Sequence, residues 1–174
     1  MNVNGTPYRT IRLADDGWAV EIIDQTKLPH EFVTRRLETM ADAATAIADM
    51  WVRGAPLIGA TAAYGMALAM REDASDGWLS LAYDRLYATR PTAVNLRWAL
   101  DDLKALLAPM NVAERAEAAY GRAAGICDED VAICSALGEH GAGIIQQIAA
   151  DRGSGEPVNI LTHCNAGWLA TVDW

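Results

Sequence analysis

The sequence predicts an α+β protein: a mainly helical N-terminal domain with a small antiparallel β element, followed by the first strand and helix start of a truncated α/β domain. Three observations lead to this prediction. Apolar and polar residues alternate near the N-terminus, apolar residues recur at helical spacing from about residue 39 onward, and a short strand-like run followed by a turn stands near the C-terminus. We therefore divide the chain into a domain at residues 1–150, a linker at 151–157 and the start of a second domain at 158–174.

The β element is predicted from two alternating segments, residues 8–13 and 18–23, that flank the turn sequence Ala-Asp-Asp-Gly. Asp-Gly between two alternating runs is typical of a β-hairpin. Residues 24–29 then interrupt the alternation, and Phe32 and Val33 are expected to start a short third strand.

The helical region is divided by glycine and proline. We expect helices near residues 39–52, 56–70, 76–88, 93–107 and 112–137, with a glycine-rich joint at 138–143 and a further short helix at 141–150. Residues 54–70 carry no charge but are rich in Ala, Gly and Thr, which favours a buried helix over a membrane span. Residues 158–162 are of strand type, and residues 163–167 are expected to turn into a helix start.

Composition excludes several classes of function. The chain has 174 residues, enough for one domain or one domain plus part of a second, and its 14 basic and 23 acidic residues give a net charge of −9. That sign opposes nucleic acid and anionic membranes as partners. Three cysteines with no C-x-x-C pair favour neither a disulfide framework nor a structural zinc site, so we expect no metal and a reducing, cytoplasmic location. Residues 1–12 also lack the apolar stretch of an export signal.

Cys164 is the first candidate for chemistry, because it lies between a predicted strand and a predicted helix start. A helix N-terminus stabilises a thiolate or binds an anion. The alternative is that Cys164 is a small buried hydrophobic residue. His163 does not decide the matter, since adjacent residues on an extended strand point to opposite faces. Cys127 and Cys134 are expected in the core.

The second candidate site is the segment Arg53, Gly54 and Ala55. It places a guanidinium group and free backbone N–H groups at a helix start, and both can bind a phosphate. Arg90, followed by Pro91 and Thr92, has the same character. In the alternative interpretation Gly54 only reverses the chain and each arginine is a solvated charge at a helix end.

Four separated strings resemble one family. They are residues 23–29 (IDQTKLP), 52–59 (VRGAPLIG), 90–96 (RPTAVNL) and 161–167 (LTHCNAG), and together they are similar to the 5-methylthioribose-1-phosphate isomerases. These enzymes belong to a wider family with the α, β and δ regulatory subunits of initiation factor 2B and with ribose-1,5-bisphosphate isomerase. Family members are about twice this length and have a Rossmann-like second domain after the cysteine string.

The resemblance implies an aldose-to-ketose isomerase of methionine salvage. Its substrate would be a small phosphorylated sugar, 5-methylthioribose 1-phosphate, its product 5-methylthioribulose 1-phosphate, and no metal, nucleotide or other cofactor would be needed. By position in the strings, Cys164 would be catalytic, and Arg53, Gly54, Ala55 and Arg90 would bind the substrate. The resemblance places a catalytic aspartate and a phosphate-binding Asn-Lys pair beyond Trp174, so this chain would carry half of the site, and we expect a homodimer.

Three alternatives remain at this stage. The chain could belong to the non-catalytic regulatory branch, it could be a ribose-1,5-bisphosphate isomerase, or it could be an inactive N-terminal fragment. The regulatory branch lacks the catalytic cysteine, whereas Cys164 is present here. The N-terminal string that includes Gln25 is more similar to the methylthioribose branch.

Overall fold

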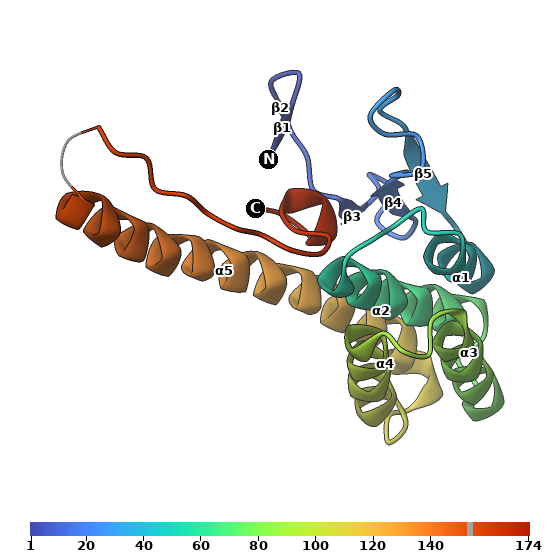
Figure 1. The fold of residues 1–174 in the computed structure, drawn as a ribbon. Coiled ribbons are helices and arrows are strands. Elements are labelled where there is room, and N and C mark those ends of the chain that lie inside the picture. The colour runs from blue at the N-terminus through green and yellow to red at the C-terminus, as the bar shows by residue number, and fades with distance from the viewer. Residues whose placement is uncertain (153–154) are drawn as a thin grey trace.

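The computed structural model describes residues 1–152 and 155–174 and confirms a mainly helical α+β fold with small antiparallel sheets (Figure 1). Five strands come first: β1 (Asn2–Val3), β2 (Thr6–Pro7), β3 (Ile11–Leu13), β4 (Val20–Ile23) and β5 (Thr34–Leu37). The helices follow: α1 (Met40–Ala48), α2 (Ala55–Glu72), α3 (Asp76–Thr89), α4 (Val94–Leu107), α5 (Val112–Arg152) and the short 3₁₀ helix η1 (Trp168–Ala170).

The predicted hairpin is confirmed. β3 pairs antiparallel with β4, Ile11 faces Ile22 across the pair, and Gly17 closes the turn with φ +78°. Asp16 accepts hydrogen bonds from the backbone N–H groups of Trp18 and Ala19, which holds the turn. The third strand, β5, begins at Thr34, slightly later than expected, although the Asp24 N–H already donates to Val33 O at 2.8 Å.

Helix α2 is the centre of the core. Every residue from Leu57 to Met70 is buried, as expected for a buried helix, and α1, α3, α4 and α5 pack around it. Its small residues allow close packing: a Cβ on Gly65 would lie 3.0 Å from Leu86 and 3.1 Å from Ala43. Among the described residues, no helix combines the length and apolar character needed to cross a membrane.

Helix α5 is longer than the sequence predicts. It runs unbroken for 41 residues, so the expected joint at residues 138–143 and the separate short helix are wrong. Glycine lowers helix stability by about 1 kcal/mol but keeps its backbone N–H, so the hydrogen-bond ladder continues through Gly138 and Gly141 where a proline would end it. The first half packs on the core through Ala119, Ala123 and Ile126, and the second half extends away from the body (Figure 1).

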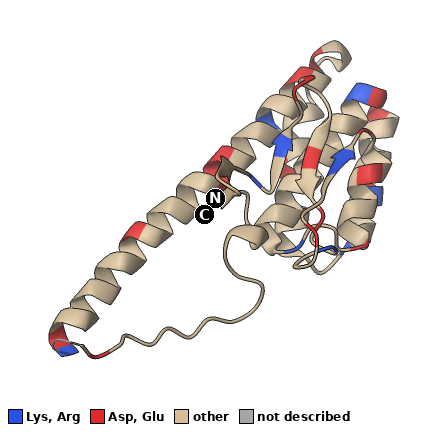
Figure 2. Cartoon of the chain, turned by 90° about the horizontal axis from the view of Figure 1, so that it is seen from above, with Lys and Arg blue, Asp and Glu red and all other residues tan. Residues whose placement is uncertain are grey.

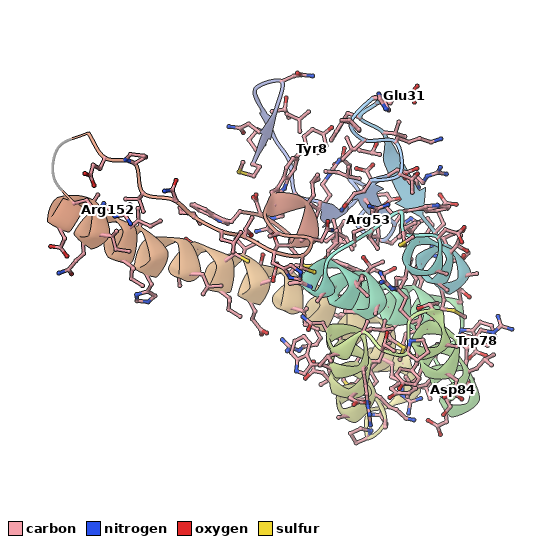
Figure 3. The ribbon with its side chains drawn as sticks, viewed as in Figure 1. Tyr8, Glu31, Arg53, Trp78, Asp84 and Arg152 are labelled. Carbon is pink, nitrogen blue, oxygen red and sulfur yellow. The ribbon has the colours of Figure 1, made fainter. Side chains whose placement is uncertain are left out.

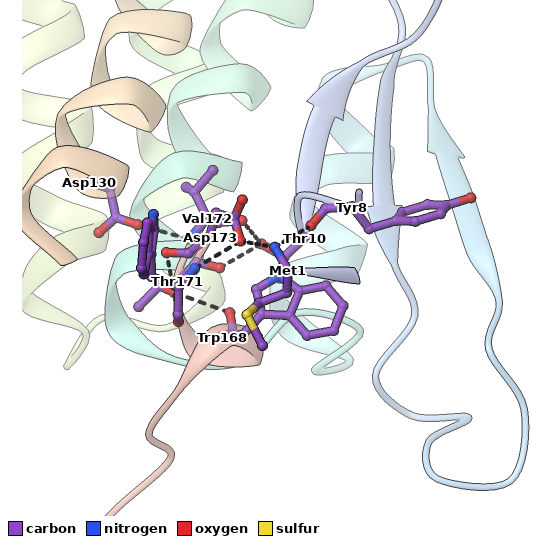
Figure 4. Close-up of polar contacts among 9 residues, drawn as sticks. Met1, Tyr8, Thr10, Asp130, Trp168, Thr171, Val172 and Asp173 are labelled. Carbon is purple, nitrogen blue, oxygen red and sulfur yellow. Dashed lines mark hydrogen bonds and ion pairs between the residues drawn. The ribbon is translucent and has the colours of Figure 1, made fainter. Parts of the chain in front are cut away.

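The chain after α5 returns toward the core. The structure forms neither the strand expected at residues 158–162 nor the helix start expected at 163–167, since a lone parallel strand has no neighbour to pair with. Of the predicted linker 151–157, residues 153 and 154 lie outside the described part. The last residues dock on the N-terminal segment and on α5. The Thr10 N–H donates to Val172 O at 3.0 Å, and the Val172 N–H donates to Asp130 Oδ2 of α5 at 2.8 Å (Figure 4).

Candidate functional site

A hollow of about 570 Å³ brings together all five residues that the sequence singles out. Segments far apart in the chain supply its walls: the loop before α2, the loop between α3 and α4, and the turn that carries Cys164. The lining residues are Met50, Arg53, Gly54, Ala55, Ile58, Arg90, Thr92, Ala93, Val94, Asn95, Cys164 and Asn165. Among these described residues none is acidic, in contrast to the chain as a whole.

The start of α2 forms one wall. Gly54 is the residue before the helix, has φ +87°, and offers no side chain to cap the free N–H groups. A Cβ at this position would lie 2.3 Å from the Cα and carbonyl oxygen of Ala170, so only glycine fits. The backbone N–H groups at the start of α2 therefore remain without a side-chain cap.

The start of α4 forms the facing wall and is also without a side-chain cap, because Ala93 precedes the helix. By contrast, Thr39 caps α1 and Ser75 caps α3. The two uncapped helix starts are close together: a Cβ on Gly59 of α2 would lie 3.0 Å from the carbonyl oxygen of Asn95 in α4. Two positive helix ends thus converge on one hollow.

Arg53 and Arg90 add two positive charges. Arg53 is exposed in the loop that enters α2 (Figure 3), and Arg90 is half-buried at the end of α3. Within the part of the chain that the structure describes, neither arginine has an ion-pair partner, while most other arginines pair with carboxylates. Both guanidinium groups are therefore available to an anion in the hollow, as bidentate phosphate recognition requires.

Cys164 is exposed on a turn and has φ +67°, so it is not the buried residue of the alternative interpretation. It does not start a helix of its own, because η1 begins only at Trp168. The N-termini of α2 and α4 line the same hollow as Cys164. His163 is exposed and does not line the hollow.

Gln25 ties the Cys164 segment to the arginine loop. Its Nε2 donates to the carbonyl oxygen of Leu169 at 2.6 Å, and its backbone N–H donates to Trp51 O at 2.9 Å. A second hollow of about 300 Å³ lies beside these contacts and shares Arg53 and Asn165 with the first.

Sequence reasoning missed three residues of this region, Gln25, Asn95 and Asn165. Each lies in one of the four strings that carry the family resemblance, which is the signal that points to them.

Asp24 holds the turn that follows β4, next to Gln25. It is fully buried and accepts from the Thr26 N–H and hydroxyl and from Arg35 Nε at 2.5 Å. Burial alone would raise the pKa of this carboxyl, but the hydrogen bonds from Thr26 and Arg35 outweigh burial and lower the pKa below its ordinary value. The Arg35 guanidinium also lies 4.1 Å from the ring centre of Trp51, in the segment just before Arg53.

The other cysteines belong to the packing of α5. Cys127 is buried, and burial raises its pKa to about 12, so it stays a neutral thiol. Cys134 is half-buried, with a pKa that burial also raises. All three cysteines are free. In residues 1–152 and 155–174, no group of three His, Cys, Asp or Glu is placed to hold a metal ion.

Two converging helix starts, two unpaired arginines and a thiol at one hollow are typical of proteins that hold a small anion beside a reactive group. The family model described as the Initiation factor 2 subunit family matches residues 51–172, more than half of the chain, and the chain belongs to that family.

The similar proteins include some named as isomerases and one named as a translation initiation factor subunit. A protein of Paramagnetospirillum magneticum named methylthioribose-1-phosphate isomerase is 67% identical over 174 residues, which cover 100% of this chain and 48% of the relative. A crystal structure of 5-methylthioribose 1-phosphate isomerase from Pyrococcus horikoshii OT3 matches with TM-score 0.79 and 37% identity, over 96% of this chain and 46% of that one.

The delta subunit of translation initiation factor eIF-2B from A. fulgidus matches equally well, with TM-score 0.79 and 39% identity over 97% of this chain and 48% of that one. The chain spans about half the length of the relatives named as isomerases. Because both structures match with TM-score 0.79, the likeness of fold alone does not separate the isomerase from the eIF-2B delta subunit.

Proposed function

We propose that this chain supplies the phosphate-binding and thiol-bearing half of a methylthioribose-1-phosphate isomerase site. The observation that carries the proposal is the single hollow that joins Arg53, Arg90 and Cys164 at two uncapped helix starts. In this assignment the reaction converts 5-methylthioribose 1-phosphate to 5-methylthioribulose 1-phosphate in methionine salvage. The names of the relatives support the same assignment.

The chemistry explains the residue types. Because the anomeric oxygen carries phosphate, the ring does not open spontaneously as that of a free sugar does. The enzyme must give a proton to the ring oxygen and then move a hydrogen from C2 to C1. Arg53, Arg90 and the backbone N–H groups after Gly54 would hold the phosphate and orient the sugar. Cys164 would be one member of the acid/base pair, and the resemblance assigns the other to an aspartate in the second half of the longer relatives.

A regulatory role without catalysis is the second candidate, because the eIF-2B delta subunit matches this fold as closely. An exposed thiol beside the anion site favours the enzyme, since an interaction module has no use for a nucleophile there. The two candidates differ in turnover, whereas both are compatible with anion binding.

The first experiment tests the anion site in the 174-residue chain, by titration calorimetry with inorganic phosphate at low salt. Arg53→Ala and Arg90→Ala should each weaken binding at least about tenfold, since a charge-assisted hydrogen bond contributes about 1.5–3 kcal/mol. Arg85→Ala is the matched control: this arginine is exposed on α3 outside the hollow and should leave affinity unchanged. Equal affinity in all three variants would reject the phosphate assignment.

The second experiment tests catalysis in a joined chain, made of these 174 residues followed by the second half of the Paramagnetospirillum magneticum relative. Cys164→Ser should abolish isomerisation but keep substrate binding, because a hydroxyl is far less acidic than a thiol. Turnover within about threefold of the parent, a barrier change of roughly 0.65 kcal/mol, would make Cys164 a packing residue.

The same proposal covers the domain organisation, the location and the oligomeric state of the protein. Residues 158–174 would begin the Rossmann-like second domain, with 1–150 as the first and 151–157 as the linker. Three free cysteines are in keeping with a reducing compartment, and we assign the protein to the cytoplasm on that ground. The homodimer implied by the resemblance is tested by the mass of the joined chain in solution.

A further inference from the structure

Gln25 is a buried polar residue that contacts two separate parts of the candidate site. It lies in the turn after β4 and is 8% exposed. Its backbone N–H donates to the carbonyl oxygen of Trp51 at 2.9 Å, in the loop that continues to Arg53. Its side-chain Nε2 donates to the carbonyl oxygen of Leu169 at 2.6 Å, in the segment that begins with Cys164. One residue is therefore bonded both to the arginine loop and to the thiol segment.

The bond to Leu169 is the nearest support of the thiol segment. Its acceptor is a carbonyl oxygen, which cannot donate, so the amide of Gln25 must present its NH₂ group there. Among the described residues from 158 to 169, Leu169 is the first in chain order to hydrogen-bond to the body of the molecule. Loss of this bond would therefore free the chain on the side of Cys164 that is otherwise held.

The backbone of Cys164 needs such a support, because its φ of +67° lies in the left-handed region. A residue with a Cβ is disfavoured in that region, and the conformation persists only where the surrounding structure holds it. The chain turns again at Gly167, with φ +89°, and enters η1. Helix η1 rests on the start of α2, where a Cβ on Gly54 would lie 2.3 Å from the Cα of Ala170. A displacement of η1 would thus be passed back to the thiol.

Gln25 is itself held in place from both sides. The fully buried carboxylate of Asp24 accepts from the Thr26 N–H and hydroxyl and from Arg35 Nε. The Arg35 guanidinium lies 4.1 Å from the ring centre of Trp51, the residue whose carbonyl oxygen Gln25 binds. The same network therefore fixes the turn that carries Gln25 and the loop that it contacts, as the support of a reactive group requires.

We propose that Gln25 is a positioning residue for the isomerisation, which holds the Cys164 thiol at a fixed place relative to a phosphate bound at Arg53. The inference rests on the proposed function of the hollow. Gln25 acts through Leu169 on the thiol segment and through Trp51 on the arginine loop, and the proposal requires no contact with the substrate. A misplacement of about 1 Å can slow a reaction about 100-fold, so loss of this support should affect turnover more than binding.

Steady-state kinetics of the joined chain test the proposal. Gln25→Met keeps the length of the side chain but has no N–H to donate, so kcat should fall at least about tenfold while KM stays within about threefold. Thr10→Val is the matched control. It removes one hydroxyl that donates to Thr171 O, in the same chain end, but this hydroxyl has no bond to the arginine loop. Its kcat should stay within about twofold of the parent although its unfolding free energy also falls.

The reactivity of the thiol gives a second measurement, which does not depend on turnover. Alkylation by iodoacetamide is followed in the 174-residue chain by peptide mass, which separates Cys164 from Cys127 and Cys134. Inorganic phosphate should slow alkylation of Cys164 at least about fivefold, because an anion beside the thiol disfavours the thiolate. In Gln25→Met, phosphate should bind with an affinity within about threefold of the parent, but the slowing should fall below about twofold.

The outcomes separate this inference from the proposed function. A parent joined chain without isomerase activity would overturn both. An active parent with a Gln25→Met variant that keeps kcat within about threefold, or keeps the full effect of phosphate on alkylation, would overturn the positioning role alone. Equal losses of kcat in Gln25→Met and Thr10→Val would show that Gln25 only stabilises the chain end, and a raised KM with unchanged kcat would make it a substrate contact.

Circular dichroism checks that each variant folds. If Gln25→Met does not fold, Gln25→Asn replaces it, because asparagine keeps the amide but is one methylene too short to reach Leu169 O. The expected fall in kcat and the expected loss of the phosphate effect are the same, and the same results would contradict the proposal.

Discussion

Asp24 and Asp130 are two carboxyl groups withdrawn from water whose pKa values move in opposite directions. For Asp24, burial raises the pKa, but hydrogen bonds from Thr26 and Arg35 outweigh it. For Asp130, burial also raises the pKa, and one hydrogen bond from the Val172 N–H only partly offsets it. The ionised form is thus favoured at the first residue and disfavoured at the second, so the two carboxyls affect stability with opposite signs.

Asp24→Asn should destabilise the protein at neutral pH by about 2 kcal/mol, because the variant loses the ion pair with Arg35 and part of the Thr26 contacts. The pKa of Asp24 in the folded protein lies below its ordinary value of 3.8. The ionised carboxylate therefore contributes its full stabilisation above pH 3.8, and this stabilisation is lost as pH falls through the folded pKa. The difference in unfolding free energy between variant and parent should therefore become smaller below about pH 4. Urea unfolding between about pH 3 and pH 7 measures the difference in unfolding free energy between variant and parent. A difference independent of pH would contradict the assignment.

Asp130→Asn should leave stability at neutral pH unchanged or raise it by up to about 1 kcal/mol. The folded pKa of Asp130 is raised, so its ionised form costs stability above that pKa and the cost vanishes as pH falls below the unfolded value. Asparagine keeps an oxygen that accepts from the Val172 N–H without the charge. Asp130→Ala is the control and should lose about 1 kcal/mol with the acceptor. Equal loss in both variants would show that the charge itself is needed.

At the scale of the elements, helices α1 to α4 fall into two classes according to whether a side chain caps the N-terminus. Thr39 and Ser75 close the starts of α1 and α3 with side-chain hydrogen bonds, whereas Gly54 and Ala93 leave the starts of α2 and α4 without one. An N-cap side chain contributes about 1 kcal/mol to stability. The uncapped N-termini of α2 and α4 lack this contribution, which a serine or threonine at Gly54 or Ala93 would otherwise supply. Uncapped N-termini leave backbone N–H groups free to bind an anion.

Gly54→Ala should destabilise the protein by at least about 2 kcal/mol, because a side chain at φ +87° is strained and its Cβ would overlap the backbone of Ala170. Exchange of the amides around η1 should accelerate as that segment is displaced, and phosphate binding should weaken. Gly77→Ala is the control, since Gly77 lies in the first turn of α3 with open space around it and alanine there should be neutral or stabilising. If Gly54→Ala left stability unchanged, η1 would not pack on the start of α2 in solution.

At the scale of the whole molecule, stability should fall from the core toward the chain end in a defined order. Helix α2 is buried along Leu57–Met70 and should exchange most slowly, whereas residues 156–162 are mostly exposed and should exchange fastest. Residues 170–173 should exchange more slowly than residues 156–162, because the structure buries Ala170 and Val172 and ties Thr171 and Val172 to Thr10.

Thr10→Val tests this ordering, because it removes the hydroxyl that donates to Thr171 O at 2.5 Å and keeps the shape of the side chain. Amides of residues 170–173 should exchange about fivefold faster in the variant, which corresponds to the roughly 1 kcal/mol of one hydrogen bond. Residues 156–162 should be unaffected. Hydrogen exchange with mass spectrometry measures both segments, and uniform exchange across 156–173 would mean that the chain end is not docked.

The local pattern of the sequence was sufficient for most elements. The hairpin around Gly17 and the helices that begin near Thr39 and Pro56 follow from signals within a few residues, so they are predictable without a structure. The wrong predictions, all in the last third of the chain, share one cause: contacts outside the segment decide its structure. The glycines at 138–143 do not end α5, and the strand-like run at 158–162 has no strand beside it.

For the site, the sequence by itself determined the residue types and, through the four strings, which residues to examine: Arg53 with Gly54 and Ala55, Arg90, and Cys164. Only the tertiary structure decided that they line one hollow, that the two arginines have no ion-pair partner among the described residues, and that Cys164 lies on a turn instead of a helix start. The physical reason is that these facts depend on contacts between distant segments. The close approach of Gly59 to Asn95 brings the two helix starts together, and the bond from Gln25 to Leu169 holds the thiol segment beside them.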